Sequence, residues 1–263
     1  MKATVLLISL VLCSLGHANA QGLIITYEET VKINLPSSQI DNPEIRAAFE
    51  RQIRDLSKTA QLSINNGVSV YKVGESEQSK KRTNRVEGNQ EITTSVRNIN
   101  PVPHTIYKNH HDKLMLSQAN FEGKEYLIEE PLINKLQWEI GRNKKEISGF
   151  QCIEATATTE SGSKVTAWYT PDIPVNAGPS SYWGLPGLIL YLELNDGGRV
   201  FSCTSIEQVK DMPAIQAPDK GEKMSPEQYD KMVDNRIQRL KDDANRNESS
   251  GNTTRRSAVI VTQ

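Results

Sequence analysis

The sequence predicts an α+β fold that is mainly β, built on a curved antiparallel sheet with a few covering helices. Short segments of alternating apolar and polar residues recur, separated by Asn, Gly or Pro, which is typical of a meandering sheet. Helical spacing of apolar residues occurs in only two stretches. The 263 residues are 37% hydrophobic with a formal charge of −1, an ordinary globular composition.

The first 20 residues have the features of a secretory signal peptide. Met1-Lys2 precedes an apolar run over Ala3–Leu15, and Ala18-Asn19-Ala20 forms a small-x-small cleavage site. Cleavage removes Lys2 and no acidic residue, which leaves 30 basic and 32 acidic residues and a formal charge of −2. We therefore expect an exported chain that is periplasmic, associated with the outer membrane, or extracellular.

The remaining charge and hydropathy exclude two classes of protein. No basic stripe is present to neutralise a phosphate backbone, which argues against nucleic-acid binding. No second apolar stretch of about 18 residues follows the signal, so the mature chain has no predicted transmembrane span. The small basic cluster Lys80-Lys81-Arg82 is interpreted as a solvated loop.

The N-terminal elements follow from periodicity. Leu23–Leu35 alternates as one long strand that Pro36 closes, and Pro43–Leu56 has helical spacing after the candidate cap Asn42. Asn66-Gly67 favours a tight hairpin turn between two alternating segments. The predicted strands that follow are Gln61–Asn65, Val68–Val73, Ile92–Val96, His104–Lys108, Lys113–Ser117, Glu125–Glu129 and Lys135–Ile140.

The clearest alternation lies in the C-terminal half, followed by a charged tail. Ser225 and Gln228 form a capping pair for a helix at about 226–243, which carries one apolar stripe. Asn245–Arg256 is polar and predicted to be disordered, and Ala258–Val261 is a short apolar end. The strands predicted here are Phe150–Thr159, Val165–Thr170, Leu188–Leu194 and Arg199–Val209.

One hexapeptide has a specific local meaning, and its residues are Gly184, Leu185, Pro186, Gly187, Leu188 and Ile189. Pro186 fixes its own φ and makes Leu185 extended, while the glycines permit close backbone approach. The segment is predicted to be a compact bend that leads directly into the strand Leu188–Leu194.

Large aromatics and prolines surround this bend. They form either a plug that completes the core or the rim of an apolar pocket. We predict a contact for an apolar ligand or a partner protein at Trp168, Tyr169, Pro171, Tyr182, Trp183 and Leu185.

These residues resemble the GLPGLI family, whose hexapeptide occurs here without a mismatch. The resemblance also includes Trp168–Pro174, the Gly178-Pro179 pair and the Gly149-Phe150-x-Cys152 strand start. Members of that family are exported proteins of one Gram-negative phylum with no assigned activity. The resemblance covers Leu23 to about Val209, so we expect a signal peptide at 1–20, a GLPGLI-type β-rich domain at 21–209 and a charged tail at 210–263.

A weaker likeness concerns the fold. The strand, turn and strand after the Trp-Tyr segment resemble periplasmic lipoprotein carriers, in which a half-barrel sheet wraps helices around an apolar cavity. This likeness is an analogy of fold only. It implies that the helices at Pro43 and Pro226 close the concave side.

Cys152 and Cys203 remain after signal cleavage. In an exported chain the natural prediction is one disulfide, which would stabilise the fold by about 4 kcal/mol. The alternative is two buried free thiols that act as small hydrophobes. Cys13 lies inside the signal and follows Leu12, so lipid attachment there is not expected.

Catalytic and metal patterns are weak. Ser161-Gly162-Ser163-Lys164 has the spacing of penicillin-recognising acylases, but a polar turn between strands is the wrong context for that motif. His110 and His111, with His104 and Asp112 nearby, are a weak metal candidate, since adjacent strand residues point to opposite faces. We predict no catalytic residue and no cofactor.

The sequence therefore predicts an exported, non-catalytic envelope protein that binds an apolar ligand or a partner protein through the bend. An alternative is a structural accessory of an outer-membrane transport or surface-assembly complex, with the tail helix as the contact. A hydrolase is the third and least favoured hypothesis.

Overall fold

The computed structural model describes residues 22–31, 57–74, 95–99, 102–249 and 257–261. The predicted signal peptide, the helix predicted at Pro43–Leu56 and the basic cluster Lys80-Lys81-Arg82 lie outside the described residues. The strands are β1 Gly22–Val31, β2 Lys58–Asn65, β3 Val68–Val73, β4 Ser95–Ile99, β5 Thr105–Asn109, β6 Leu114–Phe121, β7 Lys124–Pro131, β8 Glu139–Ile147, β9 Phe150–Thr158, β10 Lys164–Thr170, β11 Leu188–Leu194, β12 Arg199–Val209, β13 Glu222–Met224 and β14 Ser257–Val261, and the helix is α2 Pro226–Ser249.

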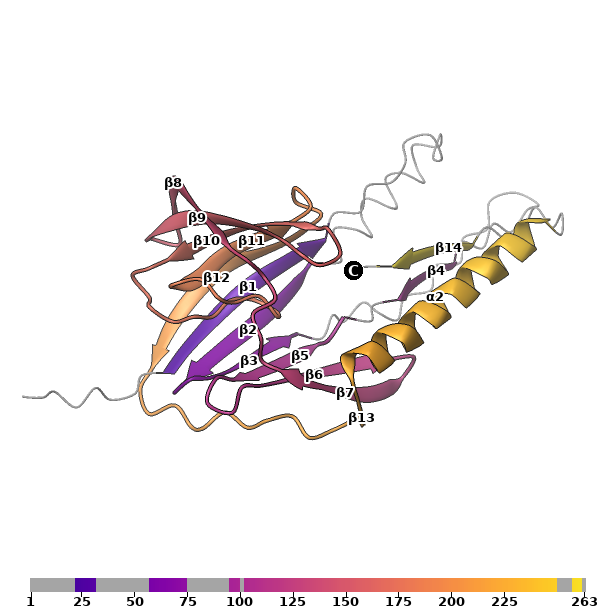
Figure 1. Ribbon diagram of the computed structural model, residues 1–263, viewed down its shortest axis with the longest axis horizontal. Coiled ribbons are helices and arrows are strands. Elements are labelled where there is room, and N and C mark those ends of the chain that lie inside the picture. The colour runs from indigo at the N-terminus through magenta and orange to yellow at the C-terminus, as the bar shows by residue number, and fades with distance from the viewer. Residues whose placement is uncertain (1–21, 32–56, 75–94, 100–101, 250–256, 262–263) are drawn as a thin grey trace, which may run out of the picture.

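Twelve strands form one curved sheet in the order β13-β7-β6-β5-β3-β2-β1-β12-β11-β10-β9-β8. The sheet does not close, and its two halves curl toward each other around β1 and β2 (Figure 1). This confirms the predicted curved, mainly β fold. One pairing departs from the antiparallel prediction, because the short strand β13 runs parallel to β7. A separate parallel pair joins β14 to β4.

The central strands form where apolar side chains alternate along the chain, so that every second residue can be buried on one face. Leu23, Ile25 and Tyr27 of β1 are buried on one face, as a strand covered on that side requires. The predicted hairpin is confirmed, since Asn66 and Gly67 both have positive φ between β2 and β3. The three strands β10, β11 and β12 also lie within one residue of their predicted bounds.

The strand predicted at Lys135–Ile140 is wrong in position. The chain is irregular over residues 132–138, called the strap here, and the strand begins at Glu139. β8 is an edge strand exposed on both faces, with Ile140 54% exposed. Such a strand has no buried face and therefore no alternation for sequence analysis to detect.

The tail helix packs on the sheet. Ser225 and Gln228 exchange hydrogen bonds as a capping box, as predicted. Tyr229 and Val233 are buried against Phe121 and Tyr126 of the β6–β7 hairpin. The helix continues to Ser249, so the disorder predicted from Asn245 is wrong for residues 245–249, because propagation of an established helix needs no further apolar contact.

The main core is one large cluster of buried residues. It unites β1, β2 and β3 with β9 to β12 and with the bend. A second cluster joins α2 to β6 and β7, and a third forms around Tyr107, Leu116 and Leu127. Within the described ranges, no helix is long and apolar enough to cross a membrane.

The docking of α2 gives a first prediction. Tyr229→Ala removes a buried ring that contacts Phe121 and Tyr126, and we expect a loss of about 3 kcal/mol in the stability of that contact. Limited proteolysis should then cut α2 faster, while the strands around β1 keep their resistance. Asp234→Ala, on the exposed side of α2, is the matched control. Unchanged cleavage of the Tyr229 variant would contradict the packing described.

Candidate functional site

The bend is held by backbone hydrogen bonds to the loop that precedes it. Gly187 N–H donates to the Leu185 carbonyl at 2.8 Å, which closes a tight turn. Leu188 and Ile189 then donate to the carbonyls of Ile173 and Ala177. The first residues of β11 therefore pair with this loop, and the predicted compact bend is present.

Gly187 lies very close to the backbone of Thr170, at the end of β10. A Cβ built on it would be 2.2 Å from the Thr170 carbonyl oxygen. Only a residue without a side chain permits this approach. The second glycine of the hexapeptide thus has a steric role that sequence analysis could only propose.

The bend is buried as part of the main core. Leu185, Leu188, Ile189 and Leu190 are at most 1% exposed, all within the main core. The Tyr27 hydroxyl, on the central strand β1, donates a buried hydrogen bond of 2.6 Å to the Ile189 carbonyl. The bend is therefore bonded to the middle of the sheet that it covers.

Trp183 lies where three elements meet. Trp138 of the strap donates its indole N–H to the Trp183 carbonyl at 2.9 Å. The His110 ring, just after β5, packs edge-on against the Trp183 ring at 5.1 Å. We call His110, Trp138 and Trp183 the mouth cluster, and all three are partly exposed. Sequence analysis treats His110 only as a metal candidate and misses Trp138.

The other predicted contact residues separate into different environments. Leu185 and Tyr169 are buried in the core, while Pro171 is exposed. Tyr182 packs against Phe201, with ring centroids 6.2 Å apart. The structure thus does not gather the six residues on one surface.

Trp168 lies on the face of β10 opposite Tyr169. The Lys145 ammonium stands 4.1 Å from the Trp168 ring centroid and 4.4 Å from that of Tyr191. These cation–π contacts occupy the Trp168 ring. Burial lowers the pKa of Lys145.

Cys152 and Cys203 are free and buried, so the predicted disulfide is absent from the structure. Each Sγ lies 3.6 Å from a backbone carbonyl oxygen, that of Phe150 for Cys152 and that of Ser205 for Cys203. Burial raises the pKa of Cys152 to about 11. The structure agrees with the alternative prediction, in which the two cysteines are buried free thiols that pack as small hydrophobic residues.

The histidine pair does not converge. His111 Nε2 lies 2.8 Å from the Asn66 carbonyl, while His110 faces Trp183. Burial and the charge of Lys108 lower the pKa of His110. In the described part of the chain, no three His, Cys, Asp or Glu side chains are grouped as metal ligands.

The Ser161 and Lys164 pattern lies in a turn between strands. The Ser161 hydroxyl hydrogen-bonds Thr159 at 2.9 Å, and the Lys164 ammonium pairs with Asp196 at 3.1 Å. The two side chains therefore have separate partners, and the helix that an acylase needs is replaced by β9 and β10.

Lys108 is a feature that sequence analysis missed. It is 1% exposed, and its Nζ has no hydrogen-bond partner in the described residues. Burial lowers the pKa of Lys108 to about 7. Lys108 follows Ile106 by two residues, so the two side chains share one side of β5, and the burial of Ile106 in the main core was the available signal.

A buried ion pair was also missed. Arg199 Nε and Nη2 both donate to Glu29 Oε1, at 3.0 and 2.6 Å, and join β12 to β1. The Tyr71 hydroxyl donates to the other carboxylate oxygen at 3.5 Å. Burial and the Glu29 charge raise the pKa of Tyr71. Glu29 shares the buried side of its strand with Ile25 and Tyr27, so a buried carboxylate could have been expected.

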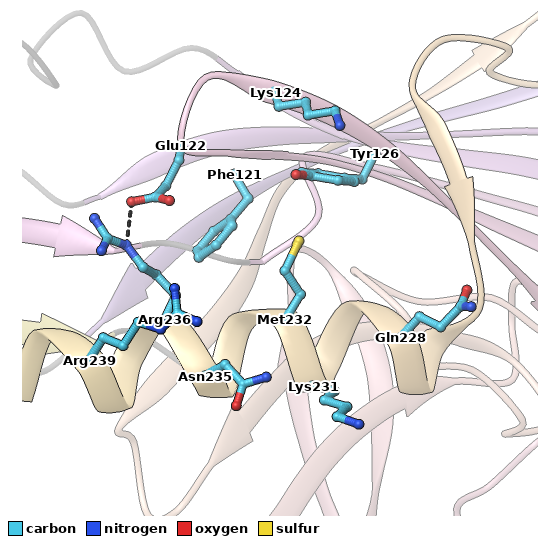
Figure 2. Close-up of a pocket in the computed structure, with 10 residues that line it drawn as sticks. All are labelled: Phe121, Glu122, Lys124, Tyr126, Gln228, Lys231, Met232, Asn235, Arg236 and Arg239. Carbon is cyan, nitrogen blue, oxygen red and sulfur yellow. Dashed lines mark hydrogen bonds and ion pairs between the residues drawn. The ribbon is translucent and has the colours of Figure 1, made fainter.

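An open groove of about 650 Å³ lies between one side of α2 and the β6–β7 hairpin, beside the packed contact of Tyr229 (Figure 2). We call it the hairpin groove. Figure 2 shows Met232 extending from α2 toward Tyr126, and Arg236 reaching Glu122 at one end. Its lining residues are Phe121, Glu122, Lys124, Tyr126, Gln228, Lys231, Met232, Asn235, Arg236 and Arg239.

Comparison with known families gives one partial match. A family model described as "Protein of unknown function (Porph_ging)" matches residues 158–191. This range contains β10, the Pro-rich loop and the bend, but not the Gly149-Phe150-x-Cys152 strand start, and the match does not confirm the GLPGLI name. A search of curated proteins finds no significant match.

Among solved structures, PNGF-II in its P21 form is similar, with 18% identity and a TM-score of 0.51. In its C2 form the identity is 17% and the TM-score 0.49. Both alignments cover 81% of this chain and 33% of PNGF-II, so the chain spans about a third of that protein. An uncharacterised conserved protein from Thermus thermophilus matches at 4% identity and a TM-score of 0.37, over 78% of this chain and 91% of that one. Identity this low shows likeness of fold alone.

The close approach at Gly187 is testable. Gly187→Ala forces a Cβ against the Thr170 carbonyl, and we expect a loss of at least about 2 kcal/mol in the free energy of unfolding. Gly198→Ala is the control, because its φ is not positive and its Cβ would make only ordinary contacts, at 3.4 Å or more. Denaturant titration followed by circular dichroism measures both. Equal losses in the two variants would show that the bend tolerates a side chain.

Lys108 predicts a pH dependence of stability. Its pKa is about 7 when folded and about 10.4 when unfolded, so between these values the unfolded chain holds more protons. The free energy of unfolding should therefore rise with pH from about 7 to 10.4. Lys108→Met should flatten this rise and stabilise the protein at pH 7 by a few kcal/mol, since one pKa unit is about 1.4 kcal/mol. Lys72→Met, at an exposed position on β3, should change neither the pH dependence of the free energy of unfolding nor its value at pH 7.

Proposed function

We propose that the chain is an exported, non-catalytic protein of the cell envelope that binds a partner protein through the mouth cluster. The observation that carries the proposal is the convergence of His110, Trp138 and Trp183 from three separate elements at a partly exposed position. Partly exposed tryptophans on a rigid support are typical of the residues that dominate protein interfaces. The bend behind Trp183 supplies that support.

Export is supported by the sequence of residues 1–20, which has the charge, apolar run and small residues of a secretory signal. Membership of the GLPGLI family is supported by the unbroken hexapeptide at Gly184–Ile189. We therefore place the protein in the periplasm, at the outer membrane or outside the cell, as part of the same proposal.

A protein partner is favoured over an apolar ligand. Leu185, Leu188, Ile189 and Leu190 are buried in the main core, so their side chains are not available to hold an apolar ligand. Such complete burial is expected if the bend is a plug that completes the core, which is one of its two predicted roles. Trp183, with His110 and Trp138 beside it, is partly exposed and available for contact.

The alternative function is a structural accessory of an outer-membrane transport or surface-assembly complex, with the tail helix as the contact. A specific observation favours it: α2 forms one wall of the hairpin groove and leaves charged side chains on its rim. The two functions use separate surfaces and are therefore distinguishable by substitution.

The mouth-cluster proposal predicts a loss of binding without unfolding. Trp183→Ala removes the ring against His110 but keeps the carbonyl that Trp138 bonds, so we expect a fall of only a few degrees in melting temperature. Retention of co-purifying envelope proteins should fall at least about tenfold, as for an interface hot spot.

Trp168→Ala is the matched control, since it removes a partly exposed indole that lies under Lys145 and is not part of the mouth cluster. Retention by this variant should stay normal. Full retention by a folded Trp183→Ala protein would reject the mouth cluster as the contact. A large loss of stability with no partner retained by the unmodified protein would assign Trp183 to folding instead.

A further inference from the structure

We propose that the hairpin groove binds a short acidic peptide segment of a partner protein, in extended conformation, with an apolar side chain between two carboxylates. The proposal shares no residue with the mouth cluster, and it gives the tail-helix alternative a partner chemistry. Its failure would therefore leave the mouth-cluster proposal untouched.

The first argument is the charge of the groove. Four of its lining residues are cations and only Glu122 is acidic. Glu122 pairs with Arg236 at 2.6 Å, and Lys124 pairs with Glu222 outside the lining. Lys231 and Arg239 are exposed and make no ion pair with any residue that the structure describes. Two cations are thus free to receive carboxylates.

The second argument is the apolar floor. Phe121 and Tyr126 are 5% and 8% exposed, and the Met232 side chain extends between helix and hairpin (Figure 2). Tyr126 is held from behind by the buried Tyr229 ring, with centroids 5.8 Å apart. A floor of two fixed rings and a flexible thioether accommodates one apolar or aromatic side chain.

The third argument is spacing. Lys231 and Arg239 are eight residues apart on α2, which corresponds to about 12 Å along the axis. In an extended peptide, residues i and i+4 are about 13 Å apart and point to the same side as residue i+2. Carboxylates at i and i+4 can therefore meet the two cations while the side chain at i+2 faces the floor.

The neighbouring flank of α2 favours a short peptide over a larger polyanion. Asp230 and Asp234 lie beside the groove on the same helix. Burial is the main cause that raises the pKa of Asp230, and the negative charge of Asp234 raises it further. A nucleic acid or a flat anionic bilayer would bring phosphates against these carboxylates as well. A peptide of about five residues spans only the groove.

The probe is a fluorescent seven-residue peptide with aspartates at its second and sixth positions, phenylalanine at its fourth, and serine elsewhere. We expect saturable binding by fluorescence anisotropy at low salt, weakening as ionic strength rises. The full chain with Lys231→Glu and Arg239→Glu together should bind at least about tenfold more weakly. Lys231→Gln with Arg239→Gln should show a smaller loss and provides a second variant if the first fails to fold.

Arg142→Glu with Lys144→Glu is the control, because it reverses two exposed charges on the distant edge strand β8. This variant should bind the probe normally. A peptide with the two aspartates adjacent should bind more weakly than the probe. The proposal is overturned by equal binding of the two peptides, by full binding to the Lys231 and Arg239 variants, or by absence of binding. It is also overturned if phosphatidylglycerol vesicles, and not the peptide, bind in a way that depends on Lys231 and Arg239.

Discussion

The constraint on which the structure depends is the need to cover the concave, apolar face of a wide sheet that does not close. The bend helps to meet this need, because it is buried in the main core and accepts a hydrogen bond from the Tyr27 hydroxyl of β1 at the Ile189 carbonyl. The approach of Gly187 to Thr170 makes the path of the bend sterically possible. Without the bend, the apolar side chains of β1, β2 and β9 to β12 would face water at considerable cost.

Each half of the sheet has its own cover, and the two candidate contact surfaces lie at those covers. The bend and strap cover one half and bring Trp138 and Trp183 together with His110. Helix α2 covers the other half at β6 and β7 and leaves the hairpin groove beside it. The surfaces proposed for binding are thus by-products of the way in which an open sheet is closed off from solvent (Figure 1).

Sequence analysis succeeded where one face of an element is buried and the other is not. Alternation located β10, β11 and β12, and the pair Ser225 and Gln228 located the start of α2. It failed for β8, whose residues are exposed on both sides, and for the short parallel strand β13. It also grouped Trp168 and Tyr169 at one contact, although the structure puts these two side chains on opposite faces of β10 and Trp168 under Lys145.

The sequence by itself determined the local elements and the bend, because periodicity, caps and the restricted backbone of Pro186 act over a few residues. Tertiary structure alone decided which distant groups meet. Glu29 and Arg199 form an ion pair although they are 170 residues apart in the sequence. Cys152 and Cys203 are free thiols on separate strands of the core. Lys108 is buried, and its ammonium has no hydrogen-bond partner among the described residues. Such contacts depend on the curvature and register of the whole sheet, which no local pattern encodes.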